Sequence, residues 1–268
     1  MVLKKQHAGT RFKFWRDRLG ISNDILEAFP LYRPFAHKTL GYFDAFLSSE
    51  PGFNQNQMVA AGDIVQTITQ RTGGWWGHVT GPMNSGKSAT LVRVAEALTN
   101  RSLVALSHGR DLERTRRKPI ILTHGNGRAV AAQPYLSLRQ VRSSVEQEVP
   151  GTIFLVDELQ FAEGVSVASL TQLLMVLKQR GSYLVTGGLD TTFLREPWEN
   201  TEPVFRIAES IFFLSARCQG DGGHCGLPGI YSQRLIEGKP AKRSDPTVLI
   251  GKEQLYRTVC PIHHEIGG

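Results

Sequence analysis

The middle of the chain alternates short apolar runs with stretches whose apolar residues recur at helical spacing. Six runs have the length of buried strands, namely Gly77–Thr80, Leu103–Ser107, Ile120–Thr123, Ile153–Val156, Tyr183–Thr186 and Ile211–Leu214. Three longer stretches predict helices between them: Thr90–Leu98, Leu136–Glu148 and Val165–Gln179. Such alternation indicates right-handed crossovers onto a mostly parallel sheet with helices on its faces. We therefore expect an α/β domain over residues 74–216.

The regions on either side differ in composition. Residues 1–73 show no strand–helix alternation, and they begin with a basic, aromatic-containing stretch, Lys4 to Arg18, in which Asp17 is the single acid. Residues 217–268 are rich in Gly, Cys and Pro and contain few helix signals. We expect this last zone to be a loop-dominated subdomain that is too small for an apolar core of its own and needs a staple.

Composition limits the classes of protein that fit. The chain has 268 residues, of which 41% are hydrophobic, and this excludes a wholly disordered chain. Its 31 Lys+Arg against 24 Asp+Glu give a net charge of +7, a mild bias towards phosphates, nucleotides or nucleic acid. No apolar run reaches the roughly 18 residues that a membrane span needs, and no apolar secretory segment opens the chain. We expect no membrane partner and a cytoplasmic location.

The most specific local motif runs from Gly81 to Ser88 and matches G-x-x-x-x-G-K-[ST]. Its glycines, Gly81 and Gly86, let successive backbone N–H groups point at phosphate oxygens, and Lys87 reaches the β- and γ-phosphates. The Ser88 hydroxyl can ligate Mg²⁺. A chance glycine-rich turn is the alternative, but the motif lies between a predicted strand and a predicted helix. The nucleotide-binding candidates are Gly81, Pro82, Met83, Asn84, Ser85, Gly86, Lys87 and Ser88.

Two acids follow the apolar run Ile153–Val156. Ligands of an open α/β sheet bind outside the carboxyl ends of its strands, so Asp157 and Glu158 are expected to face the phosphate loop. Asp157 is suited to holding Mg²⁺ through water, and Glu158 can accept a proton from an attacking hydroxyl. The alternative is a solvated acidic loop.

The three cysteines all lie near the C-terminus, which argues against a secreted disulfide framework. Cys218, Cys225, Cys260 and His263 supply the four ligands of a closed tetrahedral Zn²⁺ site. His224 and His264 compete as ligands, since each adjoins a proposed one. Three buried free thiols are the alternative.

Together these residues resemble the type II thymidine kinases, the compact zinc-containing deoxynucleoside kinases, over about residues 76–264. The segments that carry the resemblance are 81–88, Thr115-Arg116, 123–125, 157–161, 188–193, 208–210, Cys218, Cys225, 230–234, Ile250-Gly251 and 256–263. The resemblance implies transfer of the ATP γ-phosphoryl group to the 5′-hydroxyl of thymidine or deoxyuridine. It assigns phosphate and Mg²⁺ binding to Lys87, Ser88 and Asp157, the base to Glu158, and a phosphate-side arginine to Arg116.

The family resemblance also implies a nucleoside pocket and an oligomer. The pocket would be walled by Met83, Phe161, Leu189, Phe193 and Trp198. A zinc-tethered lasso, here from about Ser232 to Tyr256, would close over the base and read it largely with backbone groups. Homotetramers are usual in the family. Each apolar wall residue has the alternative role of a core residue, and Arg116 lies in a basic run, Arg110 to Lys118, that suits a solvated loop.

The chain departs from the family pattern at several places. Asn84 stands where the family usually has an aromatic residue, and Arg114 stands where an acid usually precedes the Thr-Arg pair. The first cysteine spacing is wider, and His263 replaces the last cysteine. These changes bear on nucleoside choice and turnover rather than on nucleotide binding.

About 70 residues precede the phosphate loop, where the family usually has only a few. The basic start resembles an organellar presequence, so a mitochondrial or organellar location is the alternative to a cytoplasmic one. Such presequences are usually rich in serine, however, and no serine precedes Ser22. An appended arm that packs on the kinase body or on a protein or nucleic-acid partner is favoured.

Two functional hypotheses follow. The first is an active deoxynucleoside kinase, and the second is a non-catalytic P-loop and zinc protein that belongs to a larger assembly, which in one version contains nucleic acid. The retained Lys87, Ser88, Asp157 and Glu158 favour the kinase. A generic P-loop ATPase leaves the cysteines unexplained.

Overall fold

A seven-stranded sheet forms the centre of the protein in a computed structural model. The structure describes residues 39–40, 53–112, 120–122, 128–223, 225–247 and 256–268. The strand order is β1-β9-β2-β8-β7-β3-β6, and every pairing in this sheet is parallel. The strands are β1 (Thr39–Leu40), β2 (Trp75–Thr80), β3 (Leu103–His108), β6 (Gln133–Tyr135), β7 (Ile153–Asp157), β8 (Tyr183–Gly188) and β9 (Ser210–Phe213). The α/β class expected from the apolar runs is therefore confirmed.

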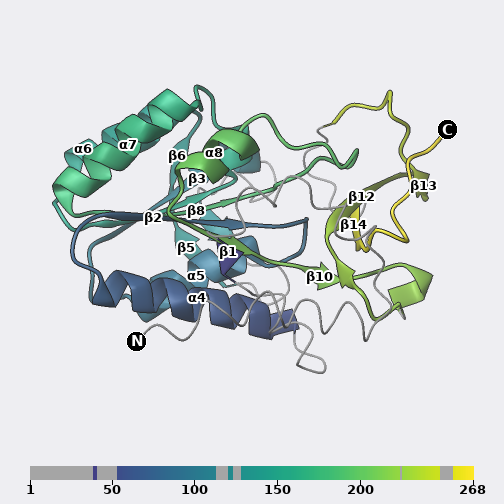
Figure 1. The fold of residues 1–268 in the computed structure, drawn as a ribbon, viewed down its shortest axis with the longest axis horizontal. Helices are drawn as coiled ribbons and strands as arrows, with labels where there is room; N and C mark the ends of the chain where they lie inside the picture. The colour runs from purple at the N-terminus through teal and green to yellow at the C-terminus, as the bar shows by residue number, and fades with distance from the viewer. Residues whose placement is uncertain (1–38, 41–52, 113–119, 123–127, 224, 248–255) are drawn as a thin grey trace.

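Helices cover both faces of the sheet (Figure 1). One face carries α4 (Phe53–Gln70) and α5 (Lys87–Ala97), and the other carries α6 (Leu138–Gln147), α7 (Val167–Arg180) and α8 (Thr201–Ile207). Because successive strand residues point to opposite faces, Trp75 and Leu155 join the core beneath α4 and α5, whereas Trp76 and Phe154 join the core beneath the other helices. Burial on both faces explains why these strands read as continuous apolar runs.

Helix α4 belongs to the core although it precedes the predicted domain. Its buried residues Ala60, Ile64 and Ile68 are four apart, so they form one stripe that packs in the same cluster as Leu91 of α5. The part of the N-terminal zone that forms α4 is thus a helix packed on the α/β domain. The segment 1–38 lies outside the described residues. We retain the division into residues 1–73, 74–216 and 217–268 as a proposal about the organisation of the sequence.

One predicted strand does not belong to the central sheet. The run Ile120–Thr123 forms β4 (Ile120–Leu122), which pairs antiparallel with β5 (Ala129–Ala131) as a separate two-stranded ribbon. The edge place beside β3 goes to β6, which contains Pro134 and therefore lacks one ladder donor, as an edge strand tolerates. Apolar content alone could not distinguish a sheet strand from this ribbon.

The C-terminal zone lies at one end of the central sheet and contains more strand than expected (Figure 1). Its strands are β10 (Ala216–Arg217), β11 (Pro228–Gly229), β12 (Tyr231–Ile236), β13 (Lys239–Pro240) and β14 (Tyr256–Val259). β12 is the centre of a three-stranded sheet with β13 and β14, and β10 pairs with β11. The small cluster beneath them includes Cys218 and Cys260, so this zone depends on its cysteines for part of its core. Among the described helices, none has the length and apolarity needed to cross a membrane.

Candidate active site and metal centre

The phosphate loop joins the carboxyl end of β2 to the first turn of α5. Gly81 has a φ of 141°, and a Cβ there would lie 2.2 Å from the carbonyl oxygen of Leu214 after β9. Gly86 has a φ of 92° at the N-cap of α5. Both glycines are required by the backbone, as the motif predicts. Asn84 also has a positive φ, of 60°, which asparagine tolerates better than an aromatic residue does.

Lys87 turns back over this loop. The lysine is only 7% exposed, and its Nζ donates hydrogen bonds to the carbonyl oxygens of Gly81 at 3.1 Å and Pro82 at 2.6 Å. Its charge reaches His78 on β2, where burial and then Lys87 lower the pKa of the imidazole to about 3. His78 is therefore neutral at physiological pH, and its Nδ1 lies 2.7 Å from the Thr186 hydroxyl.

Asp157 is the last residue of β7, and its side chain extends over Gly187 of the neighbouring strand β8, on the side where α5 packs. Its carboxylate accepts a hydrogen bond from the backbone N–H of Glu158 at 3.0 Å, and the residue is 1% exposed. A Cβ on Gly187 of β8 would lie 2.9 Å from Asp157 Oδ1 and 3.3 Å from Leu91 Cδ1 of α5. The glycine therefore leaves the space through which the acid approaches the phosphate-loop helix.

Glu158 follows in a left-handed conformation, with φ 59° and ψ 40°. Such a conformation is uncommon for a residue with a side chain, and it turns the chain sharply into the short 3-10 turn η3 (Leu159–Phe161). The Gln160 Nε2 donates a hydrogen bond to the Glu158 carboxylate, and the Gln160 Oε1 accepts one from the Leu189 backbone at 3.0 Å. Gln160 thus connects the proposed base with a proposed pocket residue. Gln160 lies within segment 157–161, which carries the family resemblance, but the sequence alone did not predict this connecting role.

Two of the proposed pocket residues lie in direct contact. The rings of Phe161 and Trp198 meet edge to face with centroids 5.4 Å apart. His108 at the end of β3 packs against Phe161 with centroids 5.8 Å apart, and the Arg110 guanidinium lies 5.3 Å from the centre of the same ring. His108 was missed because it belongs to no motif, and Arg110 was noted only as the first residue of the basic run, without a role at the pocket.

Phe193 is a core residue as well as a proposed wall residue. It is 3% exposed, and the guanidinium of Arg234 on β12 lies 5.4 Å from its ring centre. Tyr256 opens β14 opposite Arg234. Arg116, Arg114 and the segment 248–255 of the proposed lasso lie outside the described residues.

The C-terminal strands bind the phosphate loop directly. The backbone N–H of Met83 donates to the Ser232 hydroxyl of β12 at 3.0 Å, and the Thr258 hydroxyl of β14 donates to the Met83 carbonyl at 2.6 Å. Both hydroxyl residues are buried. The loop residue is therefore held from two strands of the zone that contains the cysteines. Ser232 was expected near the nucleoside, and its observed hydroxyl contact is with the phosphate loop.

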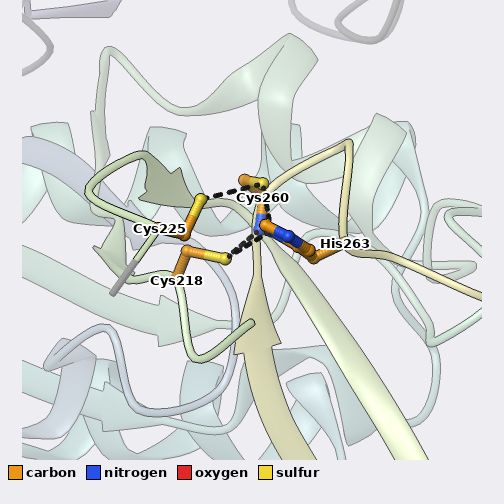
Figure 2. A group of neighbouring side chains, drawn as sticks. All are labelled: Cys218, Cys225, Cys260 and His263. Atoms are coloured by element: carbon orange, nitrogen blue, oxygen red, sulfur yellow. Dashed lines mark hydrogen bonds between the residues drawn. The ribbon is translucent and has the colours of Figure 1, made fainter. Parts of the chain in front are cut away.

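Cys218, Cys225, Cys260 and His263 converge as the spacing predicts (Figure 2). Their ligand atoms all lie within 4.8 Å of one another. The Cys225 and Cys260 sulfurs are 3.8 Å apart, and His263 Nδ1 is 3.3 Å from the Cys260 sulfur and 3.5 Å from that of Cys218. A tetrahedral Zn²⁺ with Zn–S bonds of about 2.3 Å separates its sulfurs by about 3.8 Å. The cluster is therefore compatible with a closed zinc site.

The backbone around this cluster favours a thiolate at Cys218. Burial opposes ionisation of its thiol, but hydrogen bonds from the N–H groups of Cys260 and Gly220 and from the side chains of Cys260 and His263 together lower its pKa. Burial raises the pKa of Cys260 to about 12, and the neighbouring Cys218 adds to this effect. Cys260 therefore keeps its proton beside the Cys218 thiolate unless a cation such as a metal ion compensates the second negative charge.

His264 is excluded as a ligand by its own hydrogen bonds. Arg195 Nε donates to His264 Nδ1 at 3.0 Å, and His264 Nε2 donates to the Phe193 carbonyl at 2.8 Å. Burial and the charge of Arg195 lower the pKa of this imidazole to about 4. The other competitor, His224, lies outside the described residues.

A glycine-rich phosphate loop between β2 and α5, with an acidic strand end two strands away, defines a P-loop nucleotide-binding protein. The model of the thymidine kinase family matches residues 74–264. The chain belongs to the thymidine kinase family, as the sequence motifs indicated.

The solved structures to which the chain is similar include two forms of one bacterial protein, both at low similarity. A point variant of RuvB from Thermotoga maritima shares 11% identity and a TM-score of 0.36, covering 60% of this chain and 45% of that one. The Thermotoga maritima RuvB Holliday junction branch migration motor shares 10% identity and a TM-score of 0.33, covering 62% and 45%. The chain thus spans less than half the length of these proteins, and at this similarity nothing about RuvB activity is transferred to it.

Proposed function

We propose that this protein transfers the γ-phosphoryl group of ATP to the 5′-hydroxyl of thymidine or deoxyuridine. The observation that carries the proposal is the position of Glu158. Its backbone N–H bonds to the carboxylate of Asp157, which reaches towards the phosphate-loop helix. Its own carboxylate is bonded through Gln160 to Leu189 in the proposed nucleoside pocket. A base between a phosphate site and a pocket is the arrangement that phosphoryl transfer to a hydroxyl requires.

The roles of the other residues follow from their contacts. The N–H groups of the Gly81–Ser88 loop and the Lys87 ammonium would bind the phosphates, so Lys87 would exchange its loop carbonyls for phosphate oxygens. Ser88 and Asp157 would hold Mg²⁺, which neutralises charge on the transferred group. Phe161 and Trp198 would bind the nucleobase of the substrate, and their edge-to-face pair gives a rigid apolar wall. Arg116 would add positive charge beside the phosphates.

Zinc would act structurally in this protein. Bound by the Cys3His cluster, it would fix the C-terminal strands, and Ser232 and Thr258 of those strands would hold Met83 in the phosphate loop. The homotetramer implied by the family resemblance is proposed with this function, and light scattering of the purified protein tests it.

The first prediction concerns the base. Wild-type protein with Mg·ATP and a panel of nucleosides should phosphorylate thymidine or deoxyuridine, and Glu158→Gln should lower kcat by about 10²–10⁴-fold. Glu163→Gln is the control, because it removes an exposed carboxylate from the same loop and should leave kcat unchanged.

Two outcomes would contradict the proposal. ATP binding without turnover of any nucleoside would exclude the kinase and favour a non-catalytic component of an assembly. Equal kcat in Glu158→Gln and wild type would exclude Glu158 as the base.

A further inference from the structure

Asn200 occupies the N-cap position of α8 but does not cap that helix. An asparagine there ordinarily accepts a hydrogen bond from the first helical turn, and Asn200 makes no such bond. Its Nδ2 instead donates to three carbonyl oxygens, those of Leu159 at 3.3 Å, Gln160 at 3.1 Å and Ala162 at 2.8 Å. The side chain is 7% exposed. Its amide is therefore committed to the turn that follows Glu158.

That turn needs an external partner. It begins with Glu158 in a left-handed conformation, which persists only where surrounding contacts impose it. Within the turn, Phe161 N–H bonds to the Glu158 carbonyl and Ala162 N–H to the Leu159 carbonyl, both at 3.1 Å. Asn200 also lines a small cavity together with Leu159 and Gln160 of the turn, so truncating its side chain would enlarge the space beside the turn.

We propose that Asn200 is a positioning residue for phosphoryl transfer. By binding three carbonyls of the turn it fixes the backbone of Gln160, and the Gln160 side chain then holds the carboxylate of Glu158. The inference rests on the proposed function, in which that carboxylate accepts the proton. The three hydrogen bonds of the Asn200 side chain go to Leu159, Gln160 and Ala162, and none goes to Glu158 or to a proposed substrate-binding residue. Asn200 therefore acts on Glu158 only through the turn.

Steady-state kinetics of Asn200→Ala tests this role. We expect kcat to fall by about 10–100-fold because a base displaced by about 1 Å loses that much, while KM for the nucleoside changes little. In a Gln160→Ala background the same substitution should cost less than about threefold, since the two residues act in series. Thr152→Val is the control: it removes a buried hydroxyl that bonds to Val149 and Ser102 at the opposite end of β7, and it should leave kcat unchanged.

Hydrogen exchange provides a readout that does not depend on turnover. Asn200→Ala should speed exchange of the Phe161 and Ala162 amides by about tenfold or more, and Thr152→Val should not. A wild type that phosphorylates no nucleoside would overturn both the proposed function and this inference. If the wild type is active, three results would overturn this inference alone. They are an unaltered kcat in Asn200→Ala, losses in the double variant that equal the product of the two single losses, and unaltered hydrogen exchange at Phe161 and Ala162.

Discussion

At the scale of single residues, burial imposes charge states that solvent would not. Asp190 lies after β8, and within the described residues its Oδ1 has no hydrogen-bond partner. Burial raises the pKa of this carboxyl from 3.8 to about 7, against the lowering effect of the N–H groups of Asp190 and Thr191. The pKa of His78 on β2 is shifted in the opposite direction, since burial and then Lys87 lower it and keep the imidazole neutral. Both groups favour their uncharged forms, as low-dielectric surroundings require.

The pH dependence of stability should report Asp190. Between its unfolded pKa of 3.8 and its folded pKa of about 7, the folded state holds a proton that the unfolded state has released. Stability from this group therefore falls as pH rises through that window and levels off above about 7. Relative to wild type, Asp190→Asn should gain stability over the same window, by at most about 4 kcal/mol. Urea unfolding of both proteins at pH 5, 6, 7 and 8 measures this gain, and a difference that does not vary with pH would contradict it.

At the scale of elements, the site depends on how closely neighbouring strands and helices approach. β8 lies between β2, which leads into the phosphate loop, and β7, which ends in Asp157. Gly187 on β8 is the point where the acid, the strand and α5 come together, because no side chain intervenes there. Leu189 follows the last residue of this strand, and its N–H donates a hydrogen bond to Gln160. A central strand with small residues at its end thus sets the distance between the two halves of the site.

Replacing Gly187 with alanine should therefore disturb catalysis more than folding. The new Cβ would lie 2.9 Å from Asp157 Oδ1, so the carboxylate must move, and we expect kcat to fall by about 10–100-fold. A stability loss of about 1–3 kcal/mol should accompany it. Gly62→Ala is the matched control, because a Cβ in α4 meets nothing within 4 Å and should stabilise the helix by up to about 1 kcal/mol. Wild-type turnover by Gly187→Ala would show that Asp157 is not restricted there.

How far these elements follow from the sequence depends on the range of the interactions that fix them. The buried strands β2, β3, β7, β8 and β9 and the helices α5, α6 and α7 were predicted, since apolar runs and helical periodicity are local. The ribbon of Ile120–Leu122 was assigned to the wrong sheet, because strand partners are chosen by distant residues. Asn200 could not have been found: its three acceptors lie about 40 residues earlier in the chain and meet it only in the folded protein.

At the scale of the whole molecule, the metal cluster and the phosphate loop belong to one connected structure. Cys260 and His263 follow β14, and Thr258 of that strand binds Met83 in the loop. On the other side, Arg195 binds the Pro261 and His264 carbonyls, and His264 binds the Phe193 carbonyl in the proposed pocket loop. The C-terminal zone has a small core, so its structure depends on these hydrogen bonds and on its cysteines. An ion that fixes the cysteines would therefore also fix Met83, which the strands of this zone bind.

Removing the metal should therefore affect the phosphate loop at a distance. Purified wild type should contain about one zinc ion per chain, and Cys260→Ser should lose most of it. Ile262→Ala should retain the metal, because this side chain is 69% exposed between Cys260 and His263. In the zinc-free protein, hydrogen exchange should quicken at Met83 and in β12 and β14, while the amides of α6 and α7 stay protected, since these helices belong to a separate core. Equal zinc content in Cys260→Ser would remove the proposed site. Zinc loss that leaves Met83 protected would show that the C-terminal strands hold the loop without the metal.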